Sequence, residues 1–231
     1  MGISVVQTKT ATITAAFSVT VTLTPTGAGN CLVVCAGDYL PAPALHGITL
    51  GGLAGNFARA TGTTSGDAGG EIWVDPNCAG GQTVLVVTCG AGWPGGIGVV
   101  VYEVSGLVTS GAVDKVSDAT GTSTGITSGA TATTTAIAGL WVGMGFIFGE
   151  NITGPPSPWT NTTLSGYDSY GDSLVAGYQV VSAAGTATYA STGAGSSQWV
   201  GAVVTLRGLP APPVARRNPL PMQAVARAAY Y

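Results

Sequence analysis

The segment AIAGLWVGMGFIF at residues 136–148 is the longest apolar run of the chain, and it indicates the fold class. It is shorter than the roughly 20 residues that a membrane-spanning helix needs. A short apolar run of this kind is instead typical of a buried β-strand. Part of it, WVGMGFIF (141–148), resembles WVGAVVTL (199–206). The two segments are matching strands of one sandwich, marks of two small sandwiches joined near residues 106–130, or a coincidence of composition.

Strand patterns recur along most of the chain. Residues 12–24, TITAAFSVTVTLT, alternate apolar and hydroxyl side chains apart from a step at Ala15 and Ala16, which predicts one half-buried strand. Glycine- and proline-rich turn sequences separate the other candidates. These predicted strands are residues 31–36, 47–50, 70–74, 83–89, 97–104, 131–137, 140–148, 173–181, 186–190 and 198–206.

No segment before residue 220 shows the apolar spacing of a helix. About eleven short strands without helices predict an all-β protein, an antiparallel two-sheet sandwich that is jelly-roll-like and carries an extended C-terminal tail. A barrel is the second choice. We expect one domain over residues 1–208, with the low-complexity segment 118–135 forming a loop followed by a strand.

Charge is scarce and unevenly distributed. Charged residues make up 7% of the chain, against roughly 25% in an average soluble domain. Residues 1–206 hold three basic and ten acidic side chains, a net charge of −7, whereas the last 25 residues hold four arginines and no acid. Such a body suits a protein packed against neighbours. Four dispersed arginines are too few for a nucleic-acid surface, so we expect no nucleic acid as a partner.

The C-terminal segment 209–231 has a different composition from the body. Five prolines between residues 210 and 221 remove backbone donors and favour an extended course. Arginine and tyrosine are enriched among the anchors of protein interfaces. We interpret this segment as an anchoring tail, the alternative being a disordered tail without function. Its predicted partner-binding residues are Arg207, Arg216, Arg217, Leu220, Met222, Arg227, Tyr230 and Tyr231.

The sequence offers no catalytic set. His46 is the single histidine, and no nucleophile elbow, phosphate-binding loop or zinc-protease motif is present. We therefore predict no enzymatic activity, no cofactor and no metal. A glycoside hydrolase would need two carboxylates facing each other across a cleft, which spacing along the chain cannot show.

Carboxylates and cysteines are interpreted as structural residues. Asp168 and Asp172, with Asp114 or Asp118, could form a calcium or sugar site, but loop aspartates more often form turns through their own backbone bonds. The four cysteines are expected to be small buried residues. Whether Cys31 or Cys35 bridges to another cysteine stays open.

Aromatic side chains in predicted loops form the second candidate site. Exposed aromatic rings would suit a carbohydrate or receptor surface, and those in strands are expected in the core. The loop residues are Trp93, Trp159, Tyr167 and Tyr170, and the strand residues are Trp73, Trp141 and Trp199.

In its strand pattern over residues 1–208, the sequence resembles β-sandwich proteins of tailed bacteriophage virions. The resemblance lies in GGIGVVVYEVSGL (95–107) and QWVGAVVTLRG (198–208). It implies a non-enzymatic virion component of the minor tail, head-fibre or capsid decoration type. It also implies major capsid or tail proteins as partners, homo-oligomers and a possible host-surface glycan. No signal peptide or membrane segment is seen, so synthesis in the host cytoplasm is expected.

Overall fold

The computed structural model describes residues 2–39, 47–89 and 95–210 of the chain. Strands are the only regular elements among these residues, and every pairing between them is antiparallel. The predicted all-β class and antiparallel sandwich are therefore confirmed. Within the described ranges, no helix is long and apolar enough to cross a membrane.

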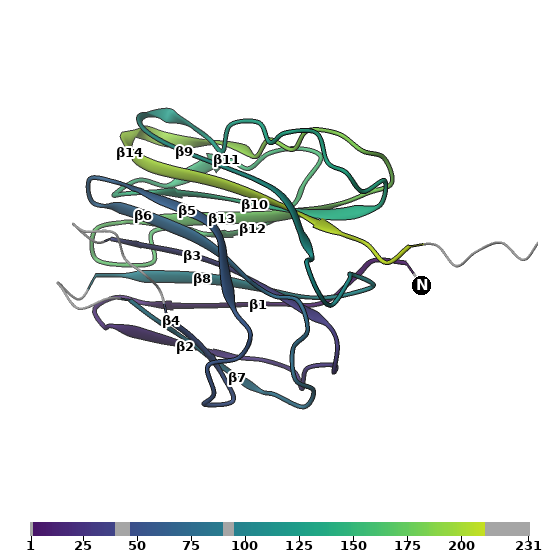
Figure 1. Ribbon diagram of the computed structural model, residues 1–231. Helices are drawn as coiled ribbons and strands as arrows, with labels where there is room; N and C mark the ends of the chain where they lie inside the picture. The colour runs from purple at the N-terminus through teal and green to yellow at the C-terminus, as the bar shows by residue number, and fades with distance from the viewer. Residues whose placement is uncertain (1, 40–46, 90–94, 211–231) are drawn as a thin grey trace, which may run out of the picture.

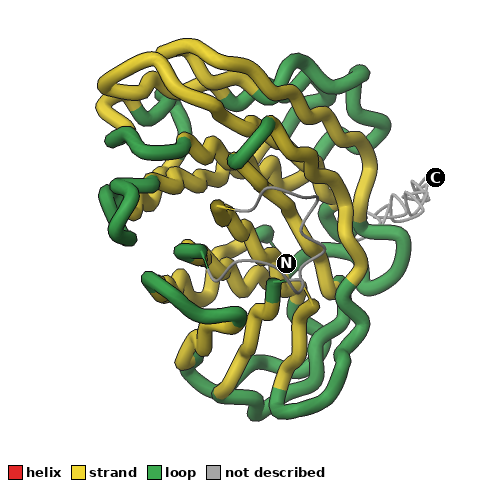
Figure 2. Tube along the Cα trace, turned by 90° about the vertical axis from the view of Figure 1, so that its left-hand side faces the viewer, coloured by secondary structure: helices red, strands yellow, loops and turns green. Residues whose placement is uncertain are grey.

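Three sheets stack face to face (Figures 1 and 2). The N-terminal sheet has the order β1 (Ser4–Ile13), β8 (Ile97–Ser105), β3 (Cys31–Tyr39), β6 (Ala68–Asp75) and β5 (Ala58–Ser65). A small sheet of β2 (Ser18–Thr22), β7 (Val84–Thr88) and β4 (Gly47–Leu50) covers its outer side. The C-terminal sheet contains β11 (Ile152–Gly154), β14 (Ala190–Arg207), β10 (Gly139–Ile147), β13 (Ser173–Val181) and β12 (Thr160–Leu164), and β9 (Val113–Thr127) pairs with β14.

Three apolar clusters lie on the faces of these sheets. The central cluster lies between the two large sheets and includes Tyr102 and Ile72 from one side and Phe146 and Val204 from the other. A second cluster fills the space under the small sheet, and a third lies on the outer side of the C-terminal sheet. The inner strands β3, β8 and β10 are therefore buried on both faces, which explains their almost continuous apolar sequences.

The two similar segments at 141–148 and 199–206 form neighbouring strands. Val142 pairs with Val204, Met144 with Ala202 and Phe146 with Val200 across β10 and β14. Both halves of the chain contribute side chains to the central cluster. The likeness thus corresponds to matching strands of one sheet.

The prediction of one strand over residues 12–24 is wrong. Strand β1 ends at Ile13 and β2 begins at Ser18, so the step at Ala15 and Ala16 is where the chain passes from the N-terminal sheet to the small sheet. Strands β5 and β12 also escaped prediction, since their sequences are mainly polar or small.

The order of loop and strand within residues 118–135 is the reverse of the prediction. Residues up to Thr127 belong to β9, which exposes alternate hydroxyl side chains. The predicted strand at 131–137 and most of the one at 186–190 are irregular segments that run side by side. The Ser128, Thr131 and Thr134 backbone N–H groups donate to carbonyls of the 185–189 segment, and their hydroxyls accept bonds from its N–H groups. Side-chain oxygens here replace part of a strand ladder, which periodicity cannot reveal.

A row of glycines lets the two large sheets approach closely. Gly37 pairs with Gly98 on one side and Gly70 on the other. A Cβ atom added at Gly37 would lie 2.6 Å from the Phe146 ring, and one at Gly70 would lie 2.9 Å from Val200. These glycines are therefore required by packing against the C-terminal sheet.

Gly37→Ala is expected to lower the free energy of unfolding by about 1–3 kcal/mol, because the added methyl group overpacks the central cluster. Urea denaturation followed by circular dichroism measures the change. Gly125→Ala is the matched control, since a Cβ atom there meets no atom within 4 Å. Equal stability of the two variants would contradict the proposed role of the glycine row.

Candidate functional site

The base of the C-terminal tail is fixed to the body by backbone hydrogen bonds on both sides. The Arg207 N–H donates to the Ala112 carbonyl at 2.8 Å, and the Gly208 N–H donates to the Ala138 carbonyl at 2.9 Å. The Leu209 N–H donates to the Gly106 carbonyl at 2.9 Å. The chain is therefore held in place as far as Leu209, at the same end of the sandwich as the N-terminus (Figure 1).

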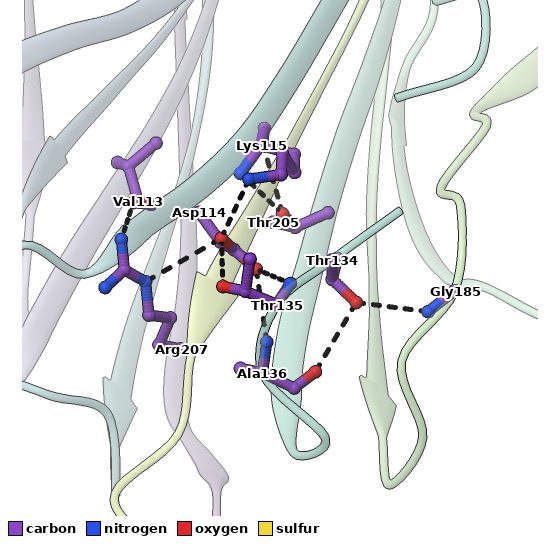
Figure 3. A network of polar contacts seen from close by, with 9 residues as sticks. All are labelled: Val113, Asp114, Lys115, Thr134, Thr135, Ala136, Gly185, Thr205 and Arg207. Carbon is purple, nitrogen blue, oxygen red and sulfur yellow. Dashed lines mark hydrogen bonds and ion pairs between the residues drawn. The ribbon is translucent and has the colours of Figure 1, made fainter. Parts of the chain in front are cut away.

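A polar network around Asp114 clamps this base (Figure 3). The Asp114 side chain is only 2% exposed. Its Oδ1 lies 3.3 Å from Lys115 Nζ and 3.8 Å from Arg207 Nε, and it accepts a hydrogen bond from Thr135 Oγ1 at 2.7 Å. Its Oδ2 accepts bonds from the N–H groups of Thr135 and Ala136 at 2.6 and 3.4 Å. The carboxylate thus ties β9 and the 135–136 segment to the last residue of β14.

The pKa of Asp114 reflects these bonds. Burial alone would raise it, but the donors from Thr135, Ala136 and Lys115 favour the ionised form and hold the pKa at about 2. The network is therefore a satisfied structural ion cluster over the neutral pH range.

Arg207 is the one predicted tail anchor that lies within the described residues. Its guanidinium faces the body, where Nη2 donates to the Val113 carbonyl at 3.2 Å and Nε approaches Asp114. It acts here as a clamp for the tail base. The other seven predicted anchors lie outside the described residues.

An apolar pocket of about 560 Å³ opens beside the tail base. Val108, Ile137 and Leu209 contribute to its lining, together with Arg207 and Pro210. Ile137 is 73% exposed and Leu209 is 44% exposed. Two large apolar side chains therefore expose part of their surface beside the tail base.

The opposite end of the strands carries an aromatic cluster. Tyr39 is the last residue of β3, and Phe148 comes directly after the last residue of β10. Their ring centroids are 4.9 Å apart, and the ring of Tyr170 lies 4.8 Å from Tyr39 and 6.0 Å from Phe148. Tyr170 is 45% exposed, so one face of the cluster is open.

Some of the predicted loop aromatics face the interior of the protein, and another is exposed. Tyr167 points inward and donates its hydroxyl to the Gly37 carbonyl at 3.0 Å. Trp159 packs edge-on against Tyr189, with ring centroids 4.9 Å apart. Tyr170 is exposed, and Trp93 and His46 lie outside the described residues. The inward positions of Tyr167 and Trp159 could not be predicted, because they depend on contacts between distant segments.

Asp168 forms a turn, in agreement with the structural interpretation. Its Oδ1 accepts bonds from the N–H groups of Tyr170 and Asp172 at 3.1 and 3.0 Å. Asp172 is fully buried, and its Oδ1 accepts the Gly149 N–H at 2.8 Å. The other two candidate aspartates do not join this loop, since Asp114 accepts a hydrogen bond from Thr135 and Asp118 accepts one from Thr61. In the described part of the chain, no three acidic, histidine or cysteine side chains are placed to hold a metal ion.

The cysteines are buried or half-buried thiols, and all four are free. Cys31 and Cys35 face the central cluster from one strand. Burial raises the pKa of Cys78 to about 11 and also raises the pKa values of Cys31 and Cys35. These thiols are therefore poor nucleophiles at neutral pH.

Asp114→Asn is expected to remove an acid-sensitive part of the stability. A carboxylate with a lowered pKa stabilises the fold above its unfolded-state pKa near 3.9, and this contribution is lost as the pH falls through about 2. The unfolding free energy of the wild type should thus fall by about 2 kcal/mol more than that of the variant between pH 5 and pH 2.

Urea titrations at both pH values measure this difference. Asp118→Asn is the control, since it removes an exposed carboxylate from the same strand. If Asp114→Asn and the wild type lose stability equally on acidification, the network does not stabilise the tail base in the way inferred here.

Comparison of the chain with protein-family models, with curated proteins and with solved structures finds no match.

Proposed function

We propose that the protein is a non-enzymatic structural component of a bacteriophage virion, attached to the particle through its C-terminal tail. The observation that carries the proposal is the clamped tail base with an apolar pocket beside it. Backbone bonds and the Asp114 network fix the chain up to Leu209. Because the base of the tail is hydrogen-bonded to the sandwich, a force on the tail acts on the whole domain. An attachment arm needs such a base.

The charge distribution supports the same function. The body has a net charge of −7 and the last 25 residues have four arginines without an acid. A basic tail is attracted to acidic surfaces, including the bodies of neighbouring copies. Major capsid or tail proteins of the particle are the proposed partners, and homo-oligomers on the particle are proposed as well.

The pocket at the tail base fits this arrangement. Ile137 and Leu209 would be covered by the particle protein that receives the tail, which removes exposed apolar surface from water. The virion type, whether capsid decoration, head fibre or minor tail protein, follows from the resemblance described above and is part of the proposal.

Deletion of residues 211–231 is expected to abolish attachment to the particle, because it removes the arm and leaves the clamp intact. Virions lacking the protein are incubated with purified wild-type or truncated chain and sedimented, and the bound fraction is measured. Ile137→Asp should also weaken attachment by placing a charge in the pocket. Tyr170→Ala, at the far end, is the matched control and should attach normally. Undiminished sedimentation of the truncated chain would contradict the proposal.

A second function, binding of a host-surface glycan, is favoured by the open face of Tyr170. Its ring is exposed and is supported from below by Tyr39 and Phe148. An exposed aromatic ring presents a flat apolar face on which a sugar ring can stack. Trp159 and Tyr167, by contrast, are engaged in packing.

Tyr170→Ala is expected to weaken glycan binding by about two- to tenfold, the usual contribution of one stacked aromatic ring. A glycan array followed by titration calorimetry on the best ligand provides the measurement. Tyr170→Phe keeps the ring and is expected to bind normally. Equal binding by all three chains would exclude this face as the glycan site.

A further inference from the structure

Two carboxylates at the aromatic end, those of Asp168 and Asp172, each have one buried oxygen that lacks a donor. Asp168 and Asp172 use their Oδ1 atoms to accept backbone N–H groups. Their Oδ2 atoms are buried and have no hydrogen-bond partner. The Asp172 N–H donates to Asp168 at 3.0 Å, so the same short loop carries both groups.

This loop joins β12 to β13 within the C-terminal sheet and contacts the N-terminal sheet. Asp172 precedes β13 of the C-terminal sheet. Asp168 packs on the start of the N-terminal sheet's β8, where a Cβ atom added at Gly96 would lie 2.4 Å from it. Tyr167 donates its hydroxyl to the Gly37 carbonyl of β3. The 165–172 loop therefore closes this end of the sandwich.

The surroundings of the pair contain acids and phenols. From β3, Asp38 adds negative charge near Asp172, and Tyr39 lies under the Tyr170 ring. Tyr167 belongs to the loop itself, and Asp67 acts on Tyr39 from the turn between β5 and β6.

The basic side chains of the described ranges are paired or placed elsewhere. Arg59 pairs with Glu71, Lys115 and Arg207 pair with Asp114, and Lys9 lies on β1 opposite Val101. No cation among the described residues therefore neutralises the Asp168–Asp172 pair.

Two such carboxylates cannot both stay ionised at low cost in a buried position. A proton held by Asp172 and hydrogen-bonded to the Asp168 side chain removes one charge and supplies a donor to the pair. Consistent with this, burial, with further contributions from Asp168 and Asp38, raises the pKa of Asp172 to about 8, despite the Gly149 N–H that favours its ionised form.

We propose that Asp168 and Asp172 share one proton, which holds the 165–172 loop closed, and that the loop opens more readily as the pH rises. Opening would move Tyr170 away from Tyr39 and uncover the faces of Tyr39 and Phe148. This proton-dependent closure of the 165–172 loop, here called the latch, lies at the end of the sandwich opposite the tail base. It does not depend on the proposed attachment function.

The direction of the pH effect follows from where the proton is bound. Below about pH 4 the acid is protonated in both the open and the closed loop, so the latch has its full strength. Between about pH 4 and 8 the closed loop keeps a proton that the open loop releases, so the opening constant rises about tenfold per pH unit. Above about pH 8 the closed loop is ionised too, and the dependence levels off.

Amide hydrogen exchange tests the latch directly in the full chain. The reporters are the N–H groups of Tyr167, Gly171 and Asp172, which are bonded within the loop. After correction for the intrinsic exchange rate, their protection in the wild type should fall about tenfold for each pH unit between pH 5 and 8. Protection that stays constant over this range would overturn the proposal.

Two variants replace the shared proton by a permanent donor. In Asp172→Asn the amide can donate to Asp168, and in Asp168→Asn it can donate to Asp172, while the Oδ1 bonds are kept. Each variant should show protection that is independent of pH between 5 and 8, so either one serves if the other fails to fold. Asp67→Asn, the control, should keep the wild-type slope. A wild-type slope in both pair variants would show that another group controls the loop.

Discussion

The structure depends on inner strands of the two large sheets that are buried on both faces. In β3, Val33 and Cys35 enter the central cluster while Leu32 and Val34 enter the cluster under the small sheet. A strand in this position has no face left for water, so a polar side chain must find its partners within the protein. Charge is thereby restricted to edges, ends and a few fully bonded sites.

Glu103 shows how the fold accommodates a carboxylate in a strand that is buried on both faces. It is fully buried in β8, yet its carboxylate accepts bonds from Gln7, from the Gly27 N–H and from Asn30. These donors link β8 to the neighbouring strand β1 and to the 24–30 loop. The buried acid is stabilised by neutral donors alone, and it fixes the entry of the chain into the sheet.

The two ends of the sandwich treat their carboxylates in opposite ways. At the tail base, Asp114 has two cations and three donor groups and stays ionised. At the aromatic end, Asp168 and Asp172 have fewer donors than acceptor atoms and no cation among the described residues. One end is therefore rigid over a wide pH range, whereas the other responds to proton concentration.

The sequence alone determined the all-β class, the buried strands β3, β8 and β10, and the turn at Asp168, because local patterns of apolar and turn-forming residues encode them. It could not decide that β10 lies beside β14, that β9 is a strand, or that Tyr167 points inward. It also gave no sign that Asp114 meets Arg207 or that Asp168 packs on Gly96. Only the tertiary structure decides these features, because each depends on hydrogen bonds or packing between segments far apart in the chain, which leave no periodic trace in either segment.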